Sequence, residues 1–210
     1  MMKIAIKRKQ SPSLIEALPS VSNLRDAKTL TLLIFALIFS TGLFGQEIYF
    51  TKTGTIIFDS STPLETIHAE NKQVTSFLKT SNGELNFAAL IKSFKFPNAL
   101  MEEHFNENFI ESSQFPKAVF KGKILNWSEI NLSKEEEQSA DIEGELTLHG
   151  VTRQIKAKAK LHRQNGKISG RSEFVVSAED FNIKIPALVR DKIAKVINVT
   201  VDIKYEPYKE

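Results

Sequence analysis

The chain of 210 residues contains no cysteine. This absence excludes disulfide cross-links, a thiol nucleophile, cysteine ligands for a metal and a lipid-modified N-terminal cysteine. The folded part must therefore be held together by packing alone. The length allows one domain, or one domain with appendages, and the 165 residues from 46 to 210 are enough for a single core without disulfides.

Long apolar runs are also scarce, and the only one spans residues 30–39 (LTLLIFALIF). It is shorter than the roughly 20 apolar residues that a transmembrane helix requires. Six Lys and Arg residues precede it, and small residues such as Ser40 and Gly45 follow it. This order predicts a secretory signal peptide in residues 1–45, followed by a domain in residues 46–210. We expect export to the periplasm or cell envelope, and an uncleaved N-terminal anchor is the competing interpretation.

Net charge is nearly absent once residues 1–45 are set aside. These residues hold six of the 28 Lys and Arg residues and two of the 25 Asp and Glu residues. The remainder carries 22 basic and 23 acidic side chains, a net charge of −1. No basic surface for nucleic acid remains, so we expect no nucleic-acid partner.

Motifs for catalysis and metal binding are missing as well. The four histidines are scattered, and no His-Glu-x-x-His spacing, nucleophile elbow or glycine-rich phosphate loop occurs. Glu103, His104 and Glu107 would form an acid/base cluster if they were functional, but a solvated helix surface is the more common reason for such a group. His149 is expected at a turn or on the outer face, with a structural role. We predict no catalytic residue, no metal site and no enzyme.

What the sequence does contain is a succession of short strand-like segments. Apolar and polar residues alternate with the two-residue period of half-buried strands, in the segments 54–59, 64–71, 76–80, 84–92, 118–127, 144–149, 153–162, 167–177 and 197–205. Asn82-Gly83 and Asn165-Gly166 predict tight hairpins. Gly150 lies where the chain must reverse direction, a place that favours a residue able to take positive φ.

Three stretches interrupt the strand pattern. Residues 98–108 have helical spacing with Asn98 as N-cap, residues 135–137 read as a solvated acidic turn, and residues 177–195 are irregular. Together these features predict an all-β fold, an antiparallel eight-stranded β-barrel with one or two short helical inserts. A barrel of this size can hold one small apolar ligand. A β-sandwich is the structural alternative.

The segment Leu146–Thr152 (LTLHGVT) matches the signature of the YceI-like family at every position. The resemblance extends over about residues 54–207. It implies a lipocalin-like barrel that binds an isoprenoid lipid, a quinone or a polyprenyl chain in an internal tunnel. The ligand would be the only bound group, with no separate cofactor.

Two further segments resemble the family and also depart from it. Residues 101–105 (MEEHF) stand where relatives have Arg-Asp-x-His-Leu, so the arginine position holds Met101. Residues 180–183 (DFNI) resemble Asp-Phe-Gly-Ile, but the usual nearby arginine is absent. Because both departures remove a basic residue, the resemblance implies a divergent member with a different or less polar ligand.

Phenylalanine is concentrated in the first half of the domain. Ten of the twelve phenylalanines after residue 45 lie between Phe50 and Phe120. Aromatic walls with few polar groups suit an apolar cavity, because affinity there comes from buried area. The candidates for the cavity wall are Phe58, Phe87, Phe94, Phe96, Leu100, Met101, His104, Phe105, Phe109, Phe120 and Phe181. The alternative is that the rings fill the barrel, with Phe58, Phe87, Phe94 and Phe120 meeting across its axis.

These observations predict an exported protein that holds an isoprenoid-type or other long apolar ligand for storage or transport in the cell envelope. The alternative is a non-catalytic interaction protein with a solid barrel and no ligand. The signature hairpin is expected to act as scaffold, with ligand choice in the phenylalanine-rich half. Lys156, Lys158 and Lys160 form a basic stripe, which by default is a solvated outer face. Peripheral contact with anionic lipid headgroups is the weaker interpretation.

Overall fold

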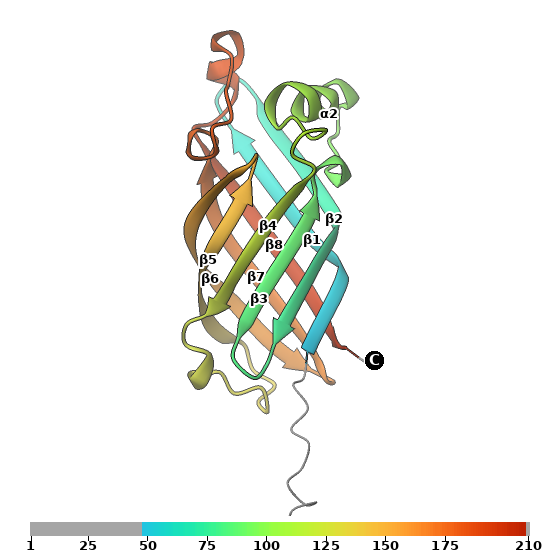
Figure 1. Ribbon diagram of the computed structural model, residues 1–210, viewed down its shortest axis with the longest axis vertical. Coiled ribbons are helices and arrows are strands. Elements are labelled where there is room, and N and C mark those ends of the chain that lie inside the picture. The colour runs from blue at the N-terminus through green and yellow to red at the C-terminus, as the bar shows by residue number, and fades with distance from the viewer. Residues whose placement is uncertain (1–47, 209–210) are drawn as a thin grey trace, which may run out of the picture. The chain divides into compact units, whose positions relative to one another are not determined.

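The computed structural model describes residues 48–208, which form a closed antiparallel barrel of eight strands in sequence order (Figure 1). The strands are β1 (Ile48–Ser61), β2 (Thr66–Lys79), β3 (Glu84–Leu90), β4 (Lys117–Ile124), β5 (Gln138–Leu148), β6 (Val151–Gln164), β7 (Lys167–Ser177) and β8 (Val196–Pro207). The last strand pairs with the first, which removes both sheet edges. The predicted all-β barrel is confirmed, and a β-sandwich is excluded. The predicted signal peptide in residues 1–45 lies outside the described residues.

Short helical segments occupy the longer connections. They are η3 (Ile91–Ser93), α2 (Ala99–His104), the π-helical η4 (Phe105–Phe109), η5 (Trp127–Glu129), η6 (Glu179–Phe181) and η7 (Ala187–Lys192). The helix predicted over residues 98–108 is present as α2 followed by η4. Its N-cap is Asn98, whose side chain accepts hydrogen bonds from the backbone amides of Leu100 and Met101.

Three of the strand connections confirm the predicted turns. Leu148 pairs with Val151, so His149 and Gly150 form a two-residue turn in which both have positive φ, 50° and 73°. Gln164 pairs with Lys167 around Asn165-Gly166 in the same manner. Such turns match the right-handed twist of the strands that they join. The third, around Asn82-Gly83, joins β2 to β3.

The first hairpin is longer and more continuous than the sequence predicts. The segments 64–71 and 76–80, predicted separately, are one continuous strand β2, and its register with β1 shifts near Gly54. At this bulge Asn71 is fully buried. Its side chain donates to the carbonyl oxygen of Leu90 and accepts from the amide of Gln73, at 2.9 and 2.8 Å. These bonds satisfy polar groups that the irregular register would otherwise leave unpaired.

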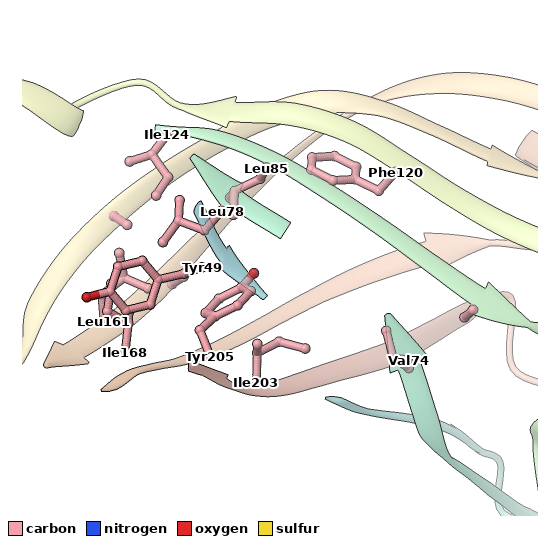
Figure 2. Close-up of a cluster of buried hydrophobic side chains, with 13 residues drawn as sticks. Tyr49, Val74, Leu78, Leu85, Phe120, Ile124, Leu161, Ile168, Ile203 and Tyr205 are labelled. Carbon is pink, nitrogen blue, oxygen red and sulfur yellow. The ribbon is translucent and has the colours of Figure 1, made fainter. Parts of the chain in front are cut away.

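One half of the barrel is packed solid. Figure 2 shows side chains from several strands pointing toward one another inside it, and we call this region the packed half. Its members are Tyr49, Val74, Leu78, Leu85, Phe120, Ile124, Ala140, Ala159, Leu161, Ile168, Ile203 and Tyr205, and Ala89 lies at its border. Large residues close the barrel interior here without a ligand, and their burial provides the hydrophobic stabilisation of the fold.

A hydrogen bond inside the packed half links two distant strands. The Ser76 hydroxyl donates to the carbonyl oxygen of Asn86 and lies 2.7 Å from the Tyr205 hydroxyl, which therefore donates to it. Tyr205 is almost completely buried. Burial raises the pKa of its hydroxyl, and the hydrogen bond to Ser76 opposes that shift only in part.

Replacing Tyr205 by phenylalanine should lower the free energy of unfolding at neutral pH by about 1 kcal/mol, the value of one buried hydrogen bond. Because its pKa is raised in the folded state, the neutral tyrosine stabilises the fold fully below pH 10 or so and loses this contribution as the pH rises further. Tyr205→Phe should remove that loss. Urea titrations between neutral pH and alkaline pH test this, with Tyr208→Phe at a half-exposed tyrosine as control. Equal alkaline slopes for wild type and Tyr205→Phe would contradict it.

Candidate ligand-binding cavity

The other half of the barrel, which we call the hollow half, contains a cavity of about 500 Å³. Its walls are almost entirely aliphatic and aromatic, and come from the strands, α2, η4 and the connection between β7 and β8. Figure 1 shows α2 beyond one end of the barrel, above the strands that form these walls. The volume falls within the range of about 300–1,000 Å³ that is usual for small-molecule sites. The barrel is therefore not solid along its whole axis.

Small inward-facing residues create the hollow. Ala89 on β3 pairs directly with Ala118 on β4, and both line the cavity. Two residues further along these strands, Phe87 pairs with Phe120, and the rings pack at 6.1 Å between centroids. Since alternate residues of a strand face the same side, the same two strands present alanines to the hollow half and phenylalanines to the packed half.

Four phenylalanine rings form a contiguous cluster on the cavity wall. Phe58 lies on β1, Phe94 and Phe96 follow η3, and Phe105 begins η4. The ring centroid of Phe58 is 5.4 Å from Phe94, 5.7 Å from Phe96 and 5.4 Å from Phe105. Tilted and edge-on rings at such distances attract each other. The cluster thereby fastens the β3–β4 insert to β1 and presents an aromatic surface to the cavity.

Eight of the eleven side chains proposed from the sequence line this cavity: Phe58, Phe94, Phe96, Leu100, Met101, His104, Phe105 and Phe109. Phe87, Phe120 and Phe181 do not. Phe87 and Phe120 face the packed half, at the strand level described above. Phe181 is buried in η6 beneath the signature turn. Sequence periodicity places Phe87 and Phe120 inside the barrel, but it does not say at which level.

The structure adds wall residues from the second half of the chain that the sequence did not single out. They are aliphatic or aromatic and include Leu146, Leu148, Phe174, Val176, Ile183, Ile185, Val189, Ile193, Ile197 and Val199. Leu146 and Leu148 belong to the signature. We expected the signature to act as scaffold only, but it also forms part of the cavity wall. These two leucines alternate with Glu145 and Thr147, and this alternation could have predicted that both leucines face inward.

Polar groups are restricted to a few positions in the wall. The buried Ser60 hydroxyl accepts a hydrogen bond from the amide of Ala194 at 2.9 Å. The Lys192 ammonium lies 3.5 Å from the Glu65 carboxylate, and this pair is partly exposed. Asn98 and His104 are the other polar side chains that contribute. An apolar chain with a small polar end matches this distribution.

His149 of the signature turn connects three segments near the cavity. Its Nδ1 lies 3.1 Å from the carbonyl oxygen of Phe181, and its Nε2 lies 2.9 Å from the Glu111 carboxylate. Its ring packs edge-on against Phe115 with 4.4 Å between centroids. These contacts agree with the predicted structural role, although the side chain is largely buried and not on the outer face. The turn thus holds the β3–β4 insert and η6 in place.

The acidic residues considered for catalysis, Glu103 and Glu107, are exposed, while His104 lines the cavity. In residues 48–208, no cluster of three or more His, Cys, Asp or Glu side chains is placed to hold a metal ion. Glu102 pairs with Lys95 at 2.6 Å, and this hydrogen bond lowers the pKa of the carboxyl. Within the same residues, no hydrogen bond or ion pair joins Glu103, His104 and Glu107.

The lysine stripe on β6 is solvated, as predicted. Its members Lys156, Lys158 and Lys160 are exposed and pair with Glu143, Asp141 and Glu137, at 3.5, 3.7 and 2.9 Å. This pairing neutralises the stripe. Among the described residues, none of the helices is both long and apolar enough to cross a membrane.

A closed antiparallel barrel with one packed half and one apolar hollow half defines a small lipocalin-like β-barrel with a ligand-sized interior. The sequence comparison makes the assignment specific, because the YceI-like domain model matches residues 48–205. The chain belongs to the YceI-like family. The resemblance inferred from Leu146–Thr152 is thereby confirmed.

The relatives found are distant. Protein YceI of Escherichia coli O17:K52:H18 (strain UMN026 / ExPEC) is 28% identical over 137 residues. That match covers 62% of this chain and 59% of the relative, less than two thirds of its length. The same protein of Shigella flexneri matches to the same extent.

Solved structures confirm the fold. A polyisoprenoid-binding domain from Saccharophagus degradans, implicated in plant cell wall breakdown, aligns with a TM-score of 0.67 at 17% identity and covers 77% of this chain and 98% of that domain. BcnA of Burkholderia cenocepacia aligns with a TM-score of 0.61 at 10% identity, over 72% of this chain and 95% of BcnA. At these identities the likeness shows a common barrel and nothing finer.

Proposed function

We propose that this protein binds one long, mostly apolar isoprenoid-type lipid, or a quinone with such a tail, in the hollow half of the barrel. The observation that carries the proposal is the cavity of about 500 Å³ with apolar walls. An apolar chain that leaves water for this cavity gains about 0.8 kcal/mol for each buried CH₂ group. The relative from Saccharophagus degradans, which is a polyisoprenoid-binding domain, supports the same class of ligand.

The wall chemistry favours a ligand with a small or weakly polar head. Met101 lines the cavity, at a position where the family resemblance implies an arginine. The remaining charged wall residues, Lys192 and Glu65, lie close to each other and largely neutralise each other. A ligand with a phosphate or carboxylate head would gain little from such a pair.

The proposal includes a role in storage or transport outside the cytoplasm, without catalysis. Its support is the basic, apolar and small-residue order of residues 1–45, which is typical of secretory signals. A closed barrel shields an apolar chain from water, and this is what carriage through an aqueous compartment requires. The absence of a nucleophile or phosphate-loop motif in the sequence agrees with a binding protein.

A chain-length series tests the proposal. Delipidated protein is titrated calorimetrically with prenyl alcohols of increasing length. Because the packed half closes the interior, the affinity should rise with each added isoprene unit and then stop rising once the chain fills the hollow half. Absence of binding at every length, or an affinity that does not depend on length, would contradict the proposal.

A further inference from the structure

The connection between β7 and β8 has two different faces. We call residues 183–195 the strap. Its inner residues Ile183, Ile185, Val189 and Ile193 line the cavity. Leu188, in contrast, points away from the wall and is 94% exposed. The strap therefore covers the ligand on one face and offers an uncovered leucine on the other.

The outer face of the strap is basic. Lys184, Arg190 and Lys195 are exposed, and none of them takes part in an ion pair within residues 48–208. Asp191 is the only acidic residue of the strap. This unpaired positive charge differs from the lysine stripe on β6, where every ammonium has an acidic partner.

Two other exposed leucines lie on segments that also line the cavity. Leu64 precedes Glu65 in the β1–β2 turn and is 69% exposed, and Leu100 on α2 is 57% exposed. The Lys192–Glu65 ion pair joins the strap to the β1–β2 turn, so these segments form one rim. Scattered exposed leucines are ordinary, but three of them beside an apolar cavity and an unpaired basic face are typical of a membrane-contacting surface.

We propose that this rim docks on the surface of an anionic lipid bilayer, where the barrel loads or releases its ligand. Leu188 enters the headgroup region, while Lys184, Arg190 and Lys195 contact lipid phosphates. Charge complementarity selects this occupant, because each basic residue near an anionic surface adds to the attraction. The exposed Glu103 on α2 and Glu107 on η4 would be repelled by an anionic surface, so the contact is on the strap side of the rim. This inference rests on the proposed function, since it concerns the exchange of the same ligand.

Vesicle binding tests the inference. Residues 46–210, with any co-purified lipid, are mixed with vesicles of phosphatidylcholine alone or of phosphatidylcholine with phosphatidylglycerol, and the bound fraction is measured by co-sedimentation. Binding to the anionic vesicles should be stronger. The triple variant Lys184→Glu, Arg190→Glu, Lys195→Glu should weaken it by on the order of 100-fold. Leu188→Ser should weaken it roughly tenfold.

Matched controls separate the strap from the rest of the surface. The triple variant Lys156→Glu, Lys158→Glu, Lys160→Glu makes the same charge change on β6. Val175→Ser removes an apolar side chain that is 57% exposed on β7. Both controls should bind vesicles like the wild type. Equal binding to both vesicle types, or equal losses for strap and control variants, would overturn the inference. Absence of binding to either vesicle would also overturn it, and would point to a macromolecule other than a bilayer.

The lipid content of the protein distinguishes a failure of this inference from a failure of the proposed function. Leu188→Ser should retain the lipid mass of the wild type in native mass spectrometry, because Leu188 is not a wall residue. Wild-type protein that carries lipid but ignores anionic vesicles contradicts the docking inference alone. Wild-type protein that neither carries nor takes up lipid contradicts the proposed function itself.

Discussion

Replacement of Ala118 by tryptophan should empty the barrel of lipid without unfolding it. Ala118 is an inward-facing wall residue opposite Ala89, at the level where small side chains create the hollow. An indole there would occupy the space that an apolar chain needs, and would bury about 150–250 Å² of its own surface. We expect the affinity for lipid to fall at least tenfold, which corresponds to about 1.4 kcal/mol or more of binding free energy, and the amount of bound lipid to fall with it.

The measurement is the amount of lipid extracted per mole of purified protein, together with the unfolding midpoint of the lipid-free form. Val119→Trp is the matched control, because Val119 is the next residue on β4 and faces the opposite side of the sheet. It should retain its lipid. Ala89→Phe fills the same space from β3 and provides a second, independent variant. A folded Ala118→Trp protein with undiminished lipid would show that the lipid lies elsewhere.

Replacement of Gly144 by alanine should destabilise the fold much more than replacement of Gly166 by alanine. Gly144 pairs with Gly122 across β4 and β5, and the Phe120 ring lies against both. A Cβ at Gly144 would collide with the carbonyl oxygen of Lys121 and would lie 2.5 Å from the Cα of Gly122. Both are backbone atoms of the neighbouring strand and cannot move aside without distorting the sheet. We expect a loss of about 3 kcal/mol or more in the free energy of unfolding.

Urea unfolding of the two proteins measures this difference. Gly166→Ala is the control, because a Cβ there meets no atom within 4 Å and only the positive φ of 74° opposes it. It should lose about 1 kcal/mol. Similar losses for the two variants would mean that the close approach of β4 and β5 is not what excludes a side chain at Gly144.

Much of the fold could be predicted because it depends on local patterns. Two-residue alternation marked most of the strands, and His149-Gly150 and Asn165-Gly166 marked tight turns that the structure confirms. Continuity of β2 through Lys72 could not be predicted, because it depends on the bonds of the buried Asn71 to Gln73 and Leu90. A bulge of this kind depends on how two strands pair, so the sequence of either strand alone does not predict it.

The cavity could be predicted only in part, for a related reason. Alternation shows that Phe87, Ala89, Ala118 and Phe120 all face inward. Only the pairing of Phe87 with Phe120 and of Ala89 with Ala118 reveals that one level is packed and the next is hollow. The sequence did not predict the strap residues as part of the cavity wall. Residues 183–193 follow no regular period that would show which side chains face inward.

The signature Leu146–Thr152 has a broader role in the structure than its sequence suggests. Leu146 and Leu148 line the cavity, while His149 fastens η6 and the β3–β4 insert beside it. Gly150 lets Phe115 approach, since a Cβ there would lie 2.6 Å from the ring. The signature therefore builds both a wall of the hollow half and the frame around it.

A crystal structure of the protein purified without delipidation would show directly whether the hollow half holds a lipid. We expect continuous elongated electron density in the hollow half, in contact with Phe58, Phe105 and Leu148 and ending at the packed half. Density for ordered water alone, or a cavity closed by inward collapse of these side chains, would contradict the claim that the hollow half of the barrel holds an apolar ligand.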